Sequence, residues 1–117
     1  MNHSFRLIDP QLLMKATGND EAAFVHLLGV FLRIAPESLA ALESAFRQGD
    51  QRAIEKEAHS LKSSLALVGA TAASDLLGSL EKNARRNQAN SDWGSFDSVR
   101  FEIQRVIDEV SDFLAAH

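Results

Sequence analysis

Residues 96–113 read FDSVRFEIQRVIDEVSDF, and their apolar positions recur at spacings of three and four. This spacing places the apolar side chains on one face of an α-helix and leaves the charged ones on the other faces. The residues of the stripe are Val99, Ile103, Val106, Val110 and Phe113. Such a stripe is typical of a helix that closes a bundle, so the stretch predicts a helical protein.

The N-terminal half carries the signals of one short helix and one long helix. The Asp-Pro pair at residues 9–10 supplies a cap and a first helical residue, and Gly18 ends the short helix. The Asn-Asp pair at residues 19–20 then caps a strongly apolar segment. Pro36 either kinks that helix or starts a new one that ends at Gly49, and we favour one long, kinked helix.

Two more helices are expected before the closing one. The first is capped by Asp50 and runs to about residue 68, and the second runs over residues 71–87. The polar residues 87–95 are predicted to form a loop. Four substantial helices joined by short connections, with the short N-terminal helix added, favour an all-α, antiparallel up-down four-helix bundle. The 117 residues are expected to form a single domain, 1–117.

Composition narrows the class of protein. Apolar residues make up 45% and charged residues 24%, as in ordinary soluble domains. No cysteine is present and no segment resembles a signal peptide or a membrane span, so we expect a cytoplasmic protein that does not bind membranes. A net charge of -4 argues against nucleic acid as a partner. The start at Met1 favours a free-standing protein, which we expect to be monomeric.

The helix expected over residues 50–68 combines a core face with an exposed histidine. Its core stripe spans about 80° of arc and consists of Ile54, Ala58, Leu61, Leu65 and Val68. His59 lies about 140° from the centre of that stripe, so its side chain points to solvent. Lys62 follows one turn later, where its ammonium can attract an anion attached to the imidazole. Ser63 and Ala66 are small, so nothing bulky shields the ring.

An exposed histidine beside a lysine is compatible with reversible phosphorylation. An unprotonated imidazole is a competent nucleophile, and a nearby cation offsets the charge of a phosphoryl group placed on it. The same pair also occurs on ordinary solvated surfaces, so the pair alone does not define a function. His26 has no second histidine at helical spacing, and no metal site is expected.

The wider spacing resembles the signature of the histidine-containing phosphotransfer (HPt) family. The matching elements are HSLKSS at residues 59–64 and Gly69-Ala70, ten and eleven residues beyond the histidine. Residues 49–50 and 77–81 also match, as does the order of helices over nearly the whole chain. Many family members carry glycine where Ser63 stands.

The resemblance implies a role for each matching residue. His59 would carry the phosphoryl group on the ring nitrogen far from the backbone, and Lys62 would stabilise it. Ser63 would keep the approach open, and its hydroxyl could contact a phosphoryl oxygen. Glu81 matches a position where relatives carry a polar or acidic residue that hydrogen-bonds the near nitrogen of the imidazole and fixes its tautomer.

The resemblance also implies a surface that docks receiver domains. Apolar residues of the short helix, small residues beyond the histidine and basic residues late in the following helix are the candidates: Ile8, Leu12, Ala66, Gly69, Lys82 and Arg85. Core packing competes with docking for Ile8 and Leu12, and attraction to a helix C-terminus competes with steering for the basic pair.

The predicted function is that of a phosphorelay intermediary. His59 would accept a phosphoryl group from a receiver aspartate of a hybrid sensor kinase and pass it to a receiver aspartate of a response regulator. It would be a carrier without cofactor or kinase activity of its own, and any Mg²⁺ would belong to the receiver. Two alternatives remain: the phosphoacceptor domain of a chemotaxis-type histidine kinase, and a module that binds receivers without transfer.

Overall fold

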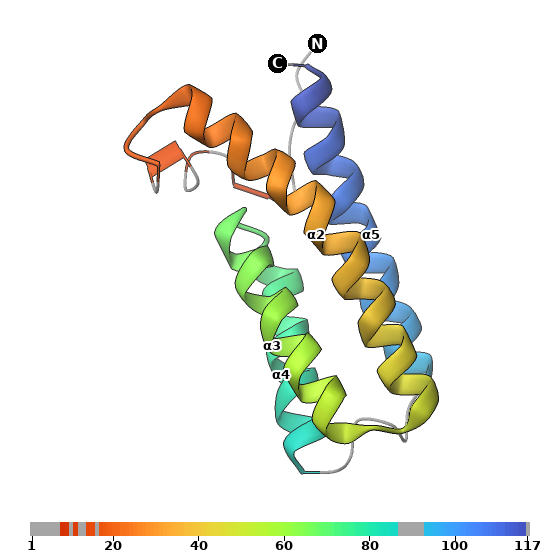
Figure 1. The fold of residues 1–117 in the computed structure, drawn as a ribbon. Helices are drawn as coiled ribbons and strands as arrows, with labels where there is room; N and C mark the ends of the chain where they lie inside the picture. The colour runs from red at the N-terminus through yellow and green to blue at the C-terminus, as the bar shows by residue number, and fades with distance from the viewer. Residues whose placement is uncertain (1–7, 10, 12–13, 16, 87–92, 117) are drawn as a thin grey trace.

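The computed structural model describes residues 8–9, 11, 14–15, 17–86 and 93–116. Its helices are α2 (Glu21–Gln48), α3 (Gln51–Leu67), α4 (Thr71–Arg85) and α5 (Trp93–Ala115). Successive helices run in opposite directions, with α2 beside α5 and α3 beside α4 (Figure 1). The main contacts close a ring from α2 through α3, α4 and α5 back to α2. The predicted all-α, up-down bundle is confirmed.

The long helix α2 is continuous through Pro36, as favoured from the sequence. It begins where the Asp20 carboxylate accepts a hydrogen bond of 3.2 Å from the backbone N–H of Ala23. It ends at Gly49, whose φ of 65° is the left-handed conformation common at a helix C-terminus. The helix bends partway along (Figure 1), as expected of an internal proline.

The turn between α3 and α4 requires a glycine. Gly69 has a φ of 75°, and a Cβ added there would lie 2.5 Å from the Cβ of Asp9. The backbone N–H of Asp9 donates a 2.9 Å hydrogen bond to the carbonyl of Val68, which fixes this close approach. Ala70, the next residue, is fully buried. The tight turn and this burial explain why a glycine and a small apolar residue stand at these two positions of the motif.

The expected short N-terminal helix is described only in part. Gln11, Met14 and Lys15 are helical, and the carboxylate of Asp9 accepts a 3.1 Å hydrogen bond from the backbone N–H of Gln11. Gly18 has the left-handed φ expected of a helix end. Leu12 lies outside the described residues.

One predicted boundary is wrong. The loop was expected to reach residue 95, but α5 already begins at Trp93. Glycine and serine at residues 94–95 are weak helix formers and resemble a loop in sequence, yet propensity is only a weak indicator where the rest of a helix is firmly packed. Residues 87–92 lie outside the described part of the chain.

The core contains one side of every helix. All members of the two stripes predicted from the sequence are buried, and they pack against the buried residues of α2: Phe24, Leu28, Phe31, Ala35, Leu39, Leu42, Ala45 and Phe46. By length and composition alone α2 could also cross a membrane. Its buried face packs against α3 and α5 and belongs to the same core cluster. Val25 and Ile34 remain exposed on its outer side.

Candidate functional site

His59 projects from the outer face of α3. Its side chain is 62% exposed, while the flanking stripe residues Ala58 and Leu61 are completely buried. The helix therefore presents the imidazole because its opposite face is held in the core. The exposure predicted from the helical wheel is confirmed.

Glu81 on α4 holds the near nitrogen of this imidazole. One carboxylate oxygen, Oε2, lies 2.9 Å from His59 Nδ1. The side chain of Glu81 is only 9% exposed, and Glu81 is the one buried charged residue among those the structure describes. A carboxylate in such a position must be paired, because burial of an unpaired charge is costly.

Two cations complete the surroundings of Glu81. Lys62 Nζ donates to Oε1 at 2.6 Å, and an Arg85 terminal nitrogen donates to Oε2 at 3.2 Å. The hydrogen bond from Lys62 is the main cause that lowers the pKa of Glu81; burial acts in the opposite direction, and the hydrogen bond with His59 lowers the pKa further. Glu81 is consequently an ionised hydrogen-bond acceptor at neutral pH.

The ionised carboxylate determines the tautomer of the imidazole. Because a carboxylate only accepts hydrogen bonds, Nδ1 must carry the proton in the bond to Glu81. The lone pair of a neutral ring then lies on Nε2, for which the described residues provide no hydrogen-bond partner. The arrangement presents a nucleophilic nitrogen to solvent on a ring whose orientation is fixed.

The small residues beside His59 are where the sequence placed them. Ala66 is exposed and leaves the approach open. Ser63 is also exposed, but its hydroxyl donates a 3.2 Å hydrogen bond to the backbone carbonyl of His59. In this rotamer the hydroxyl is bonded to the helix backbone and not directed at a phosphoryl group. Ser63 therefore serves the site through its small size, which leaves the approach to His59 open.

One of the proposed docking residues needs correction, and for two others docking stays a prediction. Ile8 is 6% exposed and belongs to the core cluster, so core packing is its role. Gly69 is half-buried beside Asp9, where the tight turn explains the glycine, and its docking role stays a prediction. Leu12 lies outside the described residues, so its docking role stays a prediction.

The basic residues of α4 divide into one that faces solvent and one that is engaged. Lys82 is exposed and remains a candidate for steering a partner. Arg85 is bonded to Glu81 and also donates from Nε to Glu55 at 2.7 Å. Glu55 was missed by the sequence analysis, although its spacing of four from His59 and the spacing of four between Glu81 and Arg85 are signals for side chains on one ridge.

A polar hollow adjoins this network on the α4 side. It has a volume of about 430 Å³ and is lined by Lys62, Ser74, Asp75, Gly78, Ser79, Glu81, Lys82 and Arg85. Lys62 forms part of its wall, and the Lys62 side chain is 34% exposed. The hollow gives that side chain room to change conformation.

Fold and site together define a helical bundle that presents an exposed histidine, oriented by a buried carboxylate and accompanied by a lysine. Residues 26–113 match the family model of the Hpt domain. The chain therefore belongs to the Hpt domain family, and it is a histidine phosphotransfer module of the kind used with receiver domains in two-component relays.

Two solved structures share the fold. Histidine-containing phosphotransfer protein B from Pseudomonas aeruginosa PAO1 has a TM-score of 0.86 and 24% sequence identity, over 97% of this chain and 99% of that one. The HPT domain of a sensor hybrid histidine kinase from Shewanella has a TM-score of 0.83 and 17% identity, over 95% and 96%. No match was found among curated protein sequences.

Proposed function

We propose that this protein relays phosphoryl groups between receiver domains through His59. A receiver of a hybrid sensor kinase would supply the group as an aspartyl phosphate, and an aspartate on a response regulator would take it. The observation that carries the proposal is the 2.9 Å contact between Glu81 Oε2 and His59 Nδ1 on a ring that is 62% exposed. It leaves Nε2 as the accessible nucleophile.

The transfer step balances without a further reactant. The Nε2 lone pair attacks phosphorus, the bond between phosphorus and the aspartyl oxygen breaks, and the aspartate leaves as a carboxylate. Nδ1 keeps its proton, so the phosphorylated ring gains positive charge that the ionised Glu81 compensates. The reverse reaction on a second receiver regenerates the neutral imidazole.

The protein would act as a carrier whose catalysis is completed by its partner. Lys62 of this protein would offset the negative charge of the phosphoryl group. Any Mg²⁺ would be held by acidic residues of the receiver domain. Lys82 and the exposed Ala66 would belong to the surface that a receiver covers. This carrier would work as a cytoplasmic monomer.

A comparison of two exposed histidines tests the proposal. His59→Gln should abolish labelling by every phosphorylated receiver in a panel, whereas His26→Gln, on the outer side of α2, should be labelled like the wild type. Circular dichroism should show the same helix content for both variants. If no receiver labels the wild type, the relay proposal is wrong.

The same proteins and labelling assays distinguish the relay from the two alternative functions. Labelling by ATP and a kinase catalytic domain, but by no receiver, would assign the chain to a chemotaxis-type kinase instead. Binding of receivers by the wild type and His59→Gln with equal affinity, without transfer to either, would assign it a binding role only.

A further inference from the structure

The two cations on Glu81 raise a question about phosphoryl acceptance. Lys62 Nζ lies 2.6 Å from Glu81 Oε1, so one of its three N–H donors is bonded to the carboxylate in this state. The proposed function requires the same ammonium beside the phosphoryl group on Nε2. Attraction to the phosphoryl group would draw Lys62 away from Glu81, and the shortest contact of the buried carboxylate would then weaken.

Arg85 is placed to hold Glu81 when that happens. Its guanidinium contacts Glu81 Oε2 at 3.2 Å, the same oxygen that accepts from His59 Nδ1. The hydrogen bond from Lys62 goes to the other carboxylate oxygen, Oε1. The departure of Lys62 would therefore disturb neither the Arg85 contact nor the imidazole contact.

Glu55 fixes the other side of the guanidinium. Arg85 Nε donates to Glu55 Oε2 at 2.7 Å, and Glu55 lies on α3 one turn before His59. The planar guanidinium thus bridges α3 and α4 with separate nitrogens on two carboxylates, a geometry that lysine cannot reproduce. The pair raises the pKa of Arg85, mainly through the hydrogen bond to Glu55.

We infer that Glu55 and Arg85 are positioning residues for phosphoryl acceptance by His59. They keep Glu81 Oε2 on Nδ1 and keep the carboxylate neutralised while Lys62 turns to the phosphoryl group. The inference rests on the proposed function. Arg85 is 61% exposed and Glu55 33% exposed, so the pair adds little to stability and its effect is expected in the transfer step.

The test uses phosphoramidate, which needs no receiver and therefore no docking surface. Nε2 attacks phosphorus, the bond between phosphorus and nitrogen of phosphoramidate breaks, and ammonia leaves. Arg85→Gln should label roughly tenfold more slowly than the wild type, the size of effect that follows loss of one charge-assisted hydrogen bond. Arg86→Gln removes the same charge at the next, exposed position and should label at the wild-type rate.

Three further variants separate positioning from a general effect of charge. Arg85→Lys keeps the charge without the two-sided geometry and should recover only part of the rate. Glu55→Gln should slow labelling, and combining it with Arg85→Gln should cost no more than Arg85→Gln alone, because Glu55 acts through Arg85. Nitrogen NMR of His59 should show a smaller fraction of the Nδ1–H tautomer in Arg85→Gln.

The outcomes are distinguishable. Equal labelling rates for Arg85→Gln and Arg86→Gln, with unchanged tautomer signals, would overturn the inference while leaving the proposed function intact. A wild-type protein that no phosphorylated receiver labels on His59 would overturn the proposed function, and the inference with it.

Discussion

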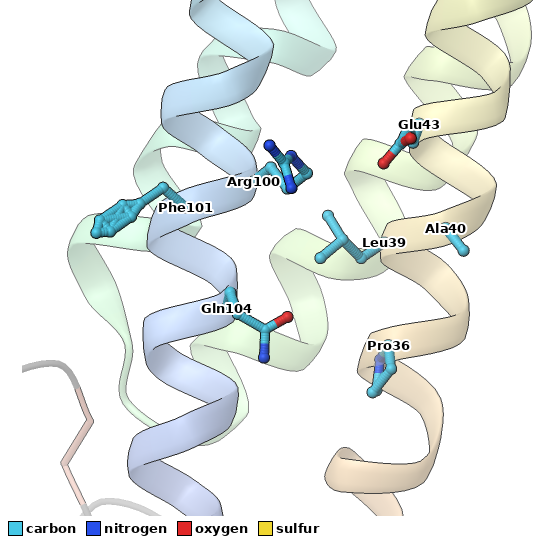
Figure 2. A pocket seen from close by; sticks show the side chains of 7 residues that line it. All are labelled: Pro36, Leu39, Ala40, Glu43, Arg100, Phe101 and Gln104. Atoms are coloured by element: carbon cyan, nitrogen blue, oxygen red, sulfur yellow. The ribbon is translucent and has the colours of Figure 1, made fainter.

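The face formed by α3 and α4 and the groove between α2 and α5 are hollowed to a similar extent but differ in where their charges lie. The groove has a volume of about 460 Å³, slightly more than the hollow beside Lys62. Leu39 and Gln104 point into it from opposite sides (Figure 2), and Phe101 is among the residues that line it. Volume alone would therefore point to the groove and not to the face that carries His59.

The ion pairs of the two faces are different in kind. Those next to the groove join residues of the same helix, as between Arg47 and Glu43 or Arg100 and Asp97. On the other face, His59 and Lys62 of α3 pair with the buried carboxylate of Glu81 on α4. Arg85 joins this carboxylate from within α4 and also pairs with Glu55 of α3. Exposed pairs within one helix contribute little, whereas a buried carboxylate persists only with partners in place. The contrast indicates that the buried charge marks the site.

Among variants that compare the two faces, the largest effect is expected from removing the charge of Glu81. Glu81→Ala should lower the rate of phosphoryl uptake from a phosphorylated receiver by about tenfold or more, since loss of a charged hydrogen bond of about 1.4 kcal/mol corresponds to a factor of ten. Glu43→Ala at the groove is the matched control and should not change the rate. Equal rates for the two variants would remove the distinction between the faces.

The turn that joins α3 to α4 should be the next most sensitive. Gly69→Ala places a side chain at a φ of 75° and within 2.5 Å of Asp9, so it should destabilise by at least about 1–2 kcal/mol in urea unfolding. Gly29→Ala, at an exposed position of α2 with open space around it, should be neutral or stabilise by up to about 1 kcal/mol. A destabilised Gly29→Ala beside an unaffected Gly69→Ala would refute this account of the turn.

The pairing of the buried carboxylate should also affect how the stability of the fold falls at acidic pH. Lys62 holds the pKa of Glu81 below its ordinary value of 4.5, so ionised Glu81 stabilises the fold fully above pH 4.5. That contribution is lost as the pH falls through the lowered pKa. Urea unfolding at a series of acidic pH values should show a shallower loss of stability for Glu81→Gln than for the wild type. Identical slopes would mean that the Glu81 pairing does not stabilise the fold.

The smallest effect is expected in the groove. Phe101 is 59% exposed, and the guanidinium carbon of Arg105 lies 5.8 Å from the centre of its ring. Phe101→Ala should cost no more than about 0.5–1 kcal/mol in stability. Phosphoryl uptake should be unchanged, and a slower uptake would extend the partner surface to the groove.

The sequence predicted the bundle because its signals were local. Asp20, Asp50 and Gly49 mark helix ends through contacts within a few residues, and the apolar stripe of α5 needs only helical periodicity. The start of α5 was misplaced because a glycine and a serine weaken the local signal there. A boundary set by packing is not visible in propensity.

The site was predictable only in part. The exposure of His59 followed from the helical wheel, whereas the burial of Glu81 depends on how α4 packs against α3. The Lys62 contact with Glu81 and the role of Arg85 link residues 19 to 30 positions apart, which periodicity within one helix cannot pair. Ile8 was ambiguous for the same reason, since its burial depends on the approach of Asp9 to the end of α3.

The central claim is that His59 receives the phosphoryl group on Nε2 while Nδ1 stays protonated against Glu81. Protein with nitrogen-labelled histidine, phosphorylated with phosphoramidate, can be studied by phosphorus and nitrogen NMR to find which nitrogen is coupled to phosphorus. The account predicts coupling to Nε2 of His59 and a proton on its Nδ1. Phosphorus bonded to Nδ1 of His59, or to His26, would contradict it.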